Sequence, residues 1–258
     1  MDLQKELEIA IKQAREAGSE ILKIYTKDFV VEYKDDKSPL TEADKRANDV
    51  IVPVLKNSFP EYSILSEESK EDENRHSNSW CWIIDPLDGT KEFIKKNGEF
   101  TVNIALAKDH KVVLGVIYVP VTGELYYAAK GIGAYYEKDW KKEQIKVTDR
   151  VYELRLVGSR SHGSEELTEM IKKYGDRITD FKSAGSSLKG CMVAKGDADI
   201  YYRFGLTMEW DTAAMQCIVE EAGGIFKQMD GSEMLYNRKN SLNEKGFYVI
   251  NRKENIFV

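Results

Sequence analysis

Cysteine is scarce in this sequence, and its three thiols are widely spaced. Cys81, Cys191 and Cys217 lie among apolar neighbours and form no Cys-x-x-Cys pair in a chain of 258 residues. Disulfide frameworks and zinc sites need more numerous or more closely spaced cysteines, so the pattern disfavours both. We therefore expect three buried free thiols and a cytoplasmic protein.

Long hydrophobic runs are also absent. No eighteen apolar residues follow one another, and the chain begins with acidic and amphipathic residues where a signal peptide would be basic and apolar. The sequence thus predicts neither export nor membrane insertion. Its formal net charge of -6 disfavours a nucleic-acid polymer as partner, because that role usually needs a basic face. A small anionic substrate is compatible with this charge, since metal ions and a few cations can reverse the field inside one cleft.

The first half of the chain has the pattern of an α+β unit. Apolar residues recur at steps of three and four in residues 3–21 and again in residues 43–55, which predicts two amphipathic helices. A short strand is expected between them, near Val30 to Tyr33. Pro53 should kink or divide the second helix, because proline lacks an amide proton and clashes with the preceding turn. Alternating apolar residues from Phe100 to Tyr136, punctuated by glycines, predict a meander of antiparallel strands.

From about Val151 the pattern changes to short strands that alternate with helices, which is typical of α/β structure. The expected strands are Arg155 to Gly158 and Asp199 to Tyr202, and the expected helices lie near 164–174, 186–195 and 211–222. No linker rich in proline or serine separates the halves. We therefore predict two subdomains, residues 1–150 and 151–258, packed face to face with the site in the cleft between them.

The most informative feature is an acidic hexapeptide, Asp85-Pro86-Leu87-Asp88-Gly89-Thr90. It follows the apolar run Trp80 to Ile84, which predicts a short strand buried on both faces. Pro86 and Gly89 then predict a tight turn directly after this strand. Two carboxylates with the Leu87 carbonyl between them can place three oxygens around one or two hard cations. A plain surface turn is the alternative, but a buried strand rarely ends in two acids without a use for them.

Two further acidic sites have a similar layout. Glu67 and Glu68 follow the apolar stretch Ile64 to Ser66, and Asp211 opens a helical pattern in the second half. Glu68 would point to the opposite face of a continued strand, so we leave it out of the expected ligands. The other four carboxylates, Glu67, Asp85, Asp88 and Asp211, would repel one another in one cleft. A site built from them makes electrostatic sense only with bound cations.

Three motifs carry a resemblance to a known family: Glu67-Glu68, the stretch Asp85 to Thr90, and Trp210-Asp211-Thr212-Ala213-Ala214. In this order and spacing they resemble the inositol monophosphatase superfamily of magnesium-dependent, lithium-sensitive phosphatases. Residues 85–106 are most similar to its CysQ-type 3'(2'),5'-bisphosphate nucleotidases. The similarity continues through three motifs of the second half: Ser159 to His162, Gly185 to Lys189 and Tyr202 to Gly205. The resemblance implies the layered αβαβα sandwich of the sugar phosphatases.

The resemblance also implies two or three Mg²⁺ ions and assigns residues to them. Its pattern puts Glu67, Asp85 and the Leu87 carbonyl on one metal, and Asp85, Asp88 and Asp211 on the second. The attacking water would be oriented by Asp44 and Thr90, and Glu67 completes the expected catalytic residues. Asp44 has an alternative role, because Thr41 to Asp44 has the spacing of a capping box and the residues alone favour that helix cap. Asp211 has a similar alternative as a helix cap, and both of its roles could coexist.

The substrate implied by the resemblance is 3'-phosphoadenosine 5'-phosphate, a small bisphosphonucleotide, hydrolysed to AMP and phosphate by a monomer or homodimer. The expected substrate contacts are Gly89, Thr90, His162, Ser186, Lys189, Arg203 and Asp211. Without the resemblance, ordinary surface chemistry would be favoured for the cations and the histidine. An inositol or sugar monophosphatase is the alternative enzyme, and a nucleotide sensor without turnover is the alternative of another class.

Overall fold

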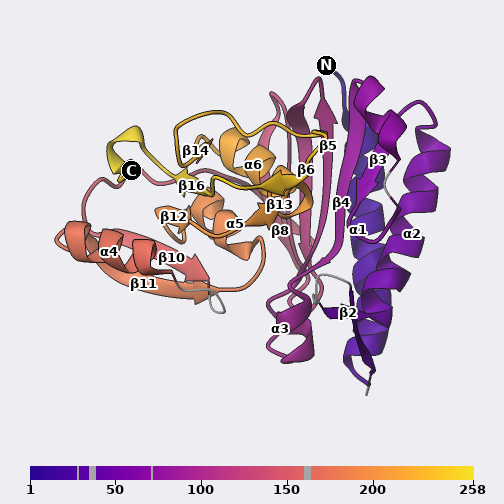
Figure 1. Ribbon diagram of the computed structural model, residues 1–258, viewed down its shortest axis with the longest axis horizontal. Coiled ribbons are helices and arrows are strands. Elements are labelled where there is room, and N and C mark those ends of the chain that lie inside the picture. Colours follow the sequence, from indigo (N-terminus) through magenta and orange to yellow (C-terminus); the bar gives the residue numbers. More distant parts are fainter. Residues whose placement is uncertain (28, 35–38, 71, 160–163) are drawn as a thin grey trace.

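The computed structural model arranges the chain in five layers (Figure 1). It describes residues 1–258 except 28, 35–38, 71 and 160–163. From one side to the other, the layers are a helix pair, a seven-stranded sheet, a second helix pair, a five-stranded sheet and a last helix. This order is the αβαβα sandwich that the resemblance implied, so the predicted fold class is confirmed.

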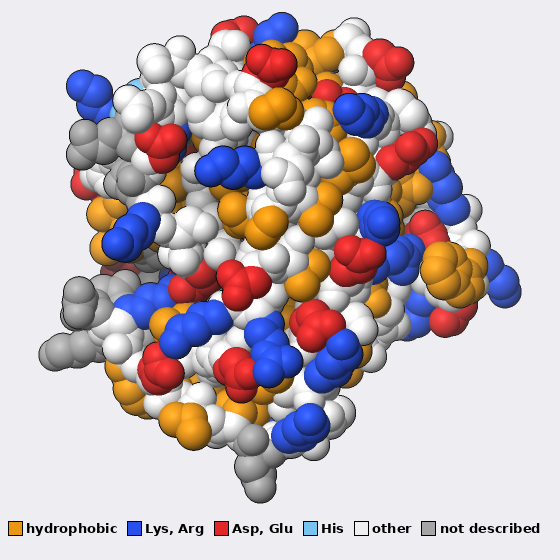
Figure 2. All heavy atoms as spheres, turned by 90° about the vertical axis from the view of Figure 1, so that its right-hand side faces the viewer, with side chains coloured by type: hydrophobic (Ala, Val, Ile, Leu, Met, Phe, Trp, Pro, Cys, Tyr) orange, Lys and Arg blue, Asp and Glu red, His pale blue; other side chains and the backbone are white. Residues whose placement is uncertain are grey.

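The first layer consists of α1 (Gln4–Tyr25) and α2 (Glu42–Ser58), which lie side by side against the large sheet (Figure 1). The inward stripe of α1 repeats at helical spacing, as predicted, and includes fully buried Ala10, Ala14 and Ala17. Figure 2 shows the outward side of this layer, where acidic and basic side chains intermix. Between the two helices, β1 (Val31–Tyr33) pairs antiparallel with β2 (Pro39–Thr41), which confirms the strand expected there.

The helix α2 runs through Pro53 without interruption, so Pro53 does not divide it, and the expected kink stays a prediction. Pro53 lies on the exposed side of α2, and so does Asp49, whose carbonyl would otherwise receive the missing hydrogen bond. Water can satisfy that carbonyl because it is on the solvent side. Burial of the opposite stripe, which includes Ala47 and Ile51, then holds the helix together.

The large sheet has the strand order β3-β4-β5-β6-β7-β8-β9. Its strands are β3 (Ser63–Ser66), β4 (Trp80–Asp88), β5 (Thr101–Lys108), β6 (Lys111–Val119), β7 (Glu124–Ala129), β8 (Gly133–Lys138) and β9 (Lys141–Ile145). From β4 onward every neighbouring pair is antiparallel, which confirms the predicted meander. The pair β3 and β4 is parallel, so both strands end at the same edge of the sheet.

Side chains of this sheet alternate between two cores. Large residues such as Trp82 and Ile84 face α1 and α2, whereas small ones such as Ala105 face the helix α6 (Glu209–Glu221). At Gly115 a Cβ atom would lie 2.4 Å from the carbonyl oxygen of Ala214, so only glycine permits α6 to approach the sheet this closely. The consequence is that α6 is held tightly along the middle of the sheet.

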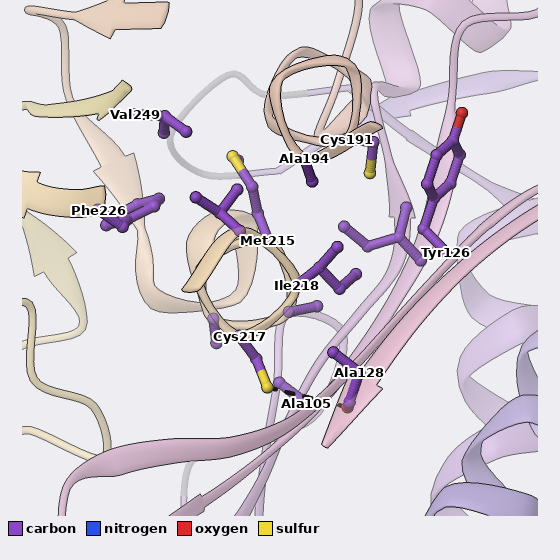
Figure 3. Packing of buried hydrophobic residues seen from close by; sticks show 14 of the residues in the cluster. Ala105, Tyr126, Ala128, Cys191, Ala194, Met215, Cys217, Ile218, Phe226 and Val249 are labelled. Carbon is purple, nitrogen blue, oxygen red and sulfur yellow. Dashed lines mark hydrogen bonds between the residues drawn. The ribbon is translucent and has the colours of Figure 1, made fainter. Parts of the chain in front are cut away.

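The second half of the chain surrounds α6. In Figure 3, Cys217 of α6 lies beside Ala105 and Ala128 of the large sheet, whereas Met215 points toward Val249 of the small sheet. The helix α5 (Leu188–Lys195) packs beside α6, and α4 (Glu165–Tyr174) covers the outer face of the small sheet. All three cysteines are buried and free, which confirms the expectation for them.

The small sheet has the order β11-β10-β12-β16-β14. Its strands are β10 (Leu154–Ser159), β11 (Ile178–Ala184), β12 (Ile200–Arg203), β14 (Ile225–Gln228) and β16 (Phe247–Ile250). The strands β10 and β12 were predicted from the sequence and the other three were not. The remaining elements are α3 (Thr90–Ile94), the 3₁₀ helices η1 (Glu73–Ser77) and η2 (Lys253–Asn255), and the pair β13 (Thr207–Met208) and β15 (Leu242–Asn243). Within the described part of the chain, no helix has both the length and the apolar character needed to cross a membrane.

Candidate active site

The edge where β3 and β4 end brings acidic residues from distant parts of the chain together. Glu67 directly follows β3, and Asp85 and Asp88 lie in the last part of β4. Asp211 comes from the first turn of α6, which packs against the same sheet. Carboxylate oxygens of Asp85, Asp88 and Asp211 all lie within 4.8 Å of one another. Three of the four predicted acidic ligands thus form one cluster.

The end of β4 differs from the expected tight turn. The strand continues through Pro86 to Asp88, and the register with β5 shifts between Asp85 and Asp88. Such a bulge leaves the residues in between without ladder partners, so the missing amide of proline costs nothing there. The turn comes at Gly89, which has a φ of +94°. The bulge therefore lets two aspartates three positions apart reach the same cluster.

One oxygen of each clustered aspartate is fixed by a backbone amide. The Leu87 amide donates to Oδ1 of Asp85 at 3.0 Å, and the Met208 amide donates to Oδ2 of Asp211 at 2.7 Å. Oδ2 of Asp88 accepts a hydrogen bond from the Ser187 amide, also at 2.7 Å. These contacts hold each carboxylate in one orientation and leave its second oxygen for a ligand.

Electrostatics make this cluster unfavourable without a cation. Burial raises the pKa of Asp85 well above its usual range, and repulsion from Glu67, Asp88 and Asp211 raises it further. Burial, followed by repulsion from Asp88, raises the pKa of Asp211 to about 8. An all-oxygen set of buried, mutually repelling carboxylates fits a hard divalent cation, which would neutralise their charge. The residues present therefore suit a metal centre.

Glu67 lies against this cluster but is held by a lysine. The Lys34 ammonium donates to Glu67 at 2.8 Å and to Glu68 at 2.6 Å. Both glutamates thus contact one cation. Glu68 was expected to face the other way only if the strand continued, and β3 ends at Ser66. The chain leaves the strand after Ser66 and enters a turn, where side chains no longer alternate. Burial raises the pKa of Glu68 to about 7 despite the lysine.

Asp44 is both a helix cap and a neighbour of the cluster. Its Oδ2 accepts hydrogen bonds from the Thr41 amide at 2.7 Å and the Thr41 hydroxyl at 2.6 Å, and this forms the capping box of α2. Its Oδ1 lies 3.2 Å from the hydroxyl of Thr90. The Thr90 hydroxyl is also 3.4 Å from the Leu87 carbonyl oxygen, a further predicted metal ligand. Burial raises the pKa of Asp44, so this carboxyl takes up a proton more readily than an exposed one.

A cavity of about 220 Å³ opens beside the carboxylates. Residues from both halves line it, among them Glu67, Asp88, Thr90, Lys189, Arg203 and Asp211. The Lys189 ammonium donates to the carbonyl oxygen of Ser186 at 2.5 Å, and burial lowers its pKa to about 8. The Nε atom of Arg203 is buried and has no hydrogen-bond partner among the described residues. Lys189 and Arg203 thus offer positive charge and free donors to an anionic ligand.

The other predicted substrate contacts have different positions. Gly89 lines the cavity. Ser186 lines it too, and its hydroxyl lies 2.8 Å from the Asp88 carbonyl oxygen and 2.7 Å from that of Glu99. Its contact with a ligand stays a prediction. His162 lies outside the described residues.

Two supporting residues were missed by the sequence reasoning. The hydroxyl of Ser187 lies 2.7 Å from Oδ2 of Asp88, and the Asn103 amide donates to the same oxygen at 3.2 Å. Asn103 also donates to the Ser187 hydroxyl at 2.9 Å. Ser187 belongs to a recognised motif, but nothing in the sequence distinguishes it from Ser186. Nothing in the sequence marks Asn103 as a supporting residue, because its partner Asp88 lies on the neighbouring strand.

Comparisons with known proteins agree with this geometry. The model of the inositol monophosphatase family matches residues 2–255. The 3'(2'),5'-bisphosphate nucleotidase CysQ of Salmonella typhimurium is 45% identical over 94% of this chain and 98% of its own length. CysQ of Escherichia coli strain K12 is 44% identical, over 92% of this chain and 96% of that protein.

Solved structures give the same result. The crystal structure of CysQ from Bacteroides thetaiotaomicron superposes with a TM-score of 0.85 at 42% identity, covering 97% of this chain and 98% of that one. An IMPase of Thermotoga maritima superposes with a TM-score of 0.82 at 28% identity, covering 96% and 92%. The match therefore extends over both sheets and the cleft region.

Proposed function

Because the chain belongs to the inositol monophosphatase family, we propose that it is a metal-dependent phosphomonoesterase that converts 3'-phosphoadenosine 5'-phosphate to AMP and phosphate. The observation that carries this proposal is the cluster of Asp85, Asp88 and Asp211 beside a cavity lined by Lys189 and Arg203. The carboxylates support this reaction class, and the two cations support a substrate that carries a second phosphate. The full-length similarity to proteins named 3'(2'),5'-bisphosphate nucleotidase supports the same substrate.

We assign Mg²⁺ to the carboxylate cluster. Asp85, Asp88 and Asp211 would hold it through the oxygens that no backbone amide fixes, with Glu67 and the Leu87 carbonyl as further ligands. When bound, such ions neutralise the charge of the phosphoryl group and lower the pKa of a bound water. Among the described residues these ligands are hard oxygens with no histidine or thiolate, a set that favours magnesium over zinc or copper.

Thr90 and Asp44 are proposed to handle the proton of the attacking water. The Thr90 hydroxyl donates to Asp44, so its lone pairs can accept a hydrogen bond from water and orient it. Asp44 can take up the proton that passes through this hydroxyl, because burial raises its pKa. The remaining oxygen of Asp44 is fixed by Thr41, which keeps the pair aligned. No covalent phosphoenzyme is needed in this scheme.

Substrate selection is proposed for Lys189 and Arg203. A bisphosphonucleotide carries a second phosphate in addition to the reacting one, and Arg203 has the planar fork of donors that suits it. Lys189 adds a point charge from the floor of the cavity. Inositol 1-phosphate has only one phosphate and would leave this charge without a partner. This difference favours the nucleotide over an inositol phosphate.

The test is phosphate release from 3'-phosphoadenosine 5'-phosphate, inositol 1-phosphate and fructose 1,6-bisphosphate, each measured in Mg²⁺ and in EDTA. We expect a strong preference for the nucleotide, abolished by EDTA and by Asp88→Asn, which removes a charge from the metal centre. A preference for inositol 1-phosphate would contradict the substrate assignment and leave the metal chemistry intact. Tight nucleotide binding without phosphate release from any substrate would contradict the enzymatic function.

A further inference from the structure

Another buried carboxylate lies two residues before Asp211 and outside the residues that line the metal cavity. Glu209, the first residue of α6, is fully buried. It accepts hydrogen bonds from the Asn237 amide at 2.6 Å, the Arg238 amide at 3.0 Å and the Arg238 Nε at 3.1 Å. A buried carboxylate with this many donors is well compensated. Its contacts therefore fix the backbone that packs around the start of α6.

Arg238 extends these contacts to the backbone that holds Asp211. Its guanidinium donates to Oδ1 of Asn243 at 2.6 Å and to the Leu242 carbonyl at 3.3 Å. The amide group of Asn243 in turn donates to the Met208 carbonyl at 2.9 Å. Met208 is the residue whose own amide fixes Oδ2 of Asp211. Hydrogen bonds thus lead from Glu209 through Arg238 and Asn243 to Met208, whose own amide fixes the metal-facing carboxylate.

A third buried residue joins this chain to the approach of β4. Arg75, from η1, is fully buried and donates to Oδ1 of Asn237 at 2.7 Å and to the Arg238 carbonyl at 2.9 Å. Asn237 returns the contact by donating to the Arg75 carbonyl at 2.9 Å. The segment of Arg75 leads directly into β4, which carries Asp85 and Asp88. The same network therefore joins the Met208 backbone that fixes Asp211 to the segment that precedes β4.

We propose that Glu209, Arg238 and Arg75 form a buried clamp that positions Asp211 relative to Asp85 and Asp88 for metal binding. They are positioning residues, because none lines the cavity beside the carboxylates. Their role rests on the proposed metal site and goes beyond it, since no ligand atom belongs to the clamp. Supporting hydrogen bonds of this kind typically change metal affinity by about 10- to 100-fold.

The chain contains a matched control for this clamp. Asp199 is also fully buried and accepts from the guanidinium of Arg155 at 2.9 Å and from the Arg155 amide at 2.8 Å. Arg155 further donates to the Gly196 carbonyl at 2.8 Å, as Arg238 does to that of Leu242. The chemistry is the same, but this pair joins β10 to the start of β12 and lies outside the residues that line the metal cavity.

The experiment compares Arg238→Lys with Arg155→Lys in the full chain. Lysine keeps the charge and loses the fork of donors in both variants, so both should lower the melting temperature by similar amounts. Metal binding is measured directly by the electron paramagnetic resonance signal of free Mn²⁺, without substrate. We expect Arg238→Lys to bind Mn²⁺ about 10-fold more weakly than the wild-type protein. Arg155→Lys should bind it as the wild-type protein does.

Several outcomes would overturn the proposal. Equal Mn²⁺ affinity in the two variants would reduce the clamp to a stabilising contact and leave the proposed function untouched. Absence of Mn²⁺ binding in the wild-type protein would overturn the metal site and the clamp together. If Arg238→Lys does not fold, Arg75→Lys replaces it, because this residue reaches Asp211 through Asn237 and Arg238. Wild-type Mn²⁺ affinity in Arg75→Lys would then overturn the proposal.

Discussion

The amide and the hydroxyl of Ser187 both lie 2.7 Å from the same oxygen of Asp88. This contact joins residues 99 positions apart, one at the end of β4 and one at the start of α5. The Ser187 hydroxyl also lies 3.1 Å from the carbonyl oxygen of Asp211. One serine therefore ties together the two parts of the chain that supply the clustered carboxylates.

Replacing Ser187 by alanine should weaken metal binding. The variant keeps the backbone amide on Asp88 but loses the hydroxyl, and loss of one supporting hydrogen bond typically costs about 10-fold in metal affinity. Titration with Mn²⁺ measures this directly. Ser164→Ala is the control, because its hydroxyl caps α4 through the Leu167 amide at 3.2 Å and touches no carboxylate of the cluster. Equal Mn²⁺ affinity in both variants would contradict the role of Ser187.

Much of the fold could be predicted because its signals are local. The helices α1, α2 and α6 and the meander from β5 to β8 each carry an apolar repeat within one segment. The strand β11 gave no such signal, because residues 179–181 are all exposed and show no alternation. The strand β14 is buried at one position only and β16 at all four, so neither shows the alternation of a half-buried strand. The division into subdomains at residue 150 stays a prediction.

The site could be predicted only in part, for a similar reason. Its carboxylates belong to motifs that can be recognised along the chain, and the family resemblance is confirmed. The residues that contact these carboxylates are single serine, asparagine and lysine residues with ordinary neighbours. Ser187, Asn103 and Lys34 acquire their roles only when distant segments meet. Tertiary contacts of this kind leave no pattern in one sequence.

Arg203→Ala should separate the two classes of substrate. Loss of a hydrogen bond to a charged group costs about 1.5–3 kcal/mol, so kcat/KM for 3'-phosphoadenosine 5'-phosphate should fall about 10- to 100-fold. Hydrolysis of inositol 1-phosphate should change little, because it has no second phosphate. Arg46→Ala, on the exposed side of α2, is the control and should leave both rates unchanged. An equal loss on both substrates would refute the assignment of Arg203.

Lys189 should give the nucleotidase activity an alkaline limit. Burial lowers the pKa of this ammonium to about 8, against the opposing charges of Asp88, Glu92 and Asp211, while Arg203 lowers it further. The side chain is therefore charged below pH 8 and neutral above it, so kcat/KM for the bisphosphate should fall as pH rises through 8. The negative charges of the aspartates raise the pKa of Lys189. Metal bound at the aspartates would neutralise these charges, so the alkaline limit would not move above pH 8.

The matching variant is Lys189→Arg, because arginine stays charged at every pH of the assay. The alkaline fall of kcat/KM between pH 8 and about 10 should disappear in this variant. A profile identical to that of the wild-type protein would assign the limit to another group.

Lys34 should compete with metal for Glu67. Its ammonium occupies the Glu67 carboxylate at 2.8 Å, so a cation that binds there has to displace an ion pair. Lys34→Met removes this competitor and leaves two unpaired glutamates, which should strengthen Mn²⁺ binding about fivefold. Lys45→Met is the control, because Lys45 pairs at 2.7 Å with the exposed Glu32. Weaker Mn²⁺ binding in Lys34→Met would show that this lysine supports the site.

Asp44 has two roles to separate, because the same carboxylate completes a helix cap and contacts Thr90. Thr41→Ala removes the capping hydroxyl and should lower the free energy of unfolding by about 1 kcal/mol, with little change in kcat. Asp44→Asn keeps an acceptor for the Thr41 amide but cannot take up a proton from Thr90. Its kcat should therefore fall by more than about 100-fold, with a stability similar to that of Thr41→Ala. Thermal unfolding and kcat measured on both variants separate the two roles. A kcat in Asp44→Asn that is no lower than in Thr41→Ala would make the cap its whole role, and proton uptake would then need another group near Thr90.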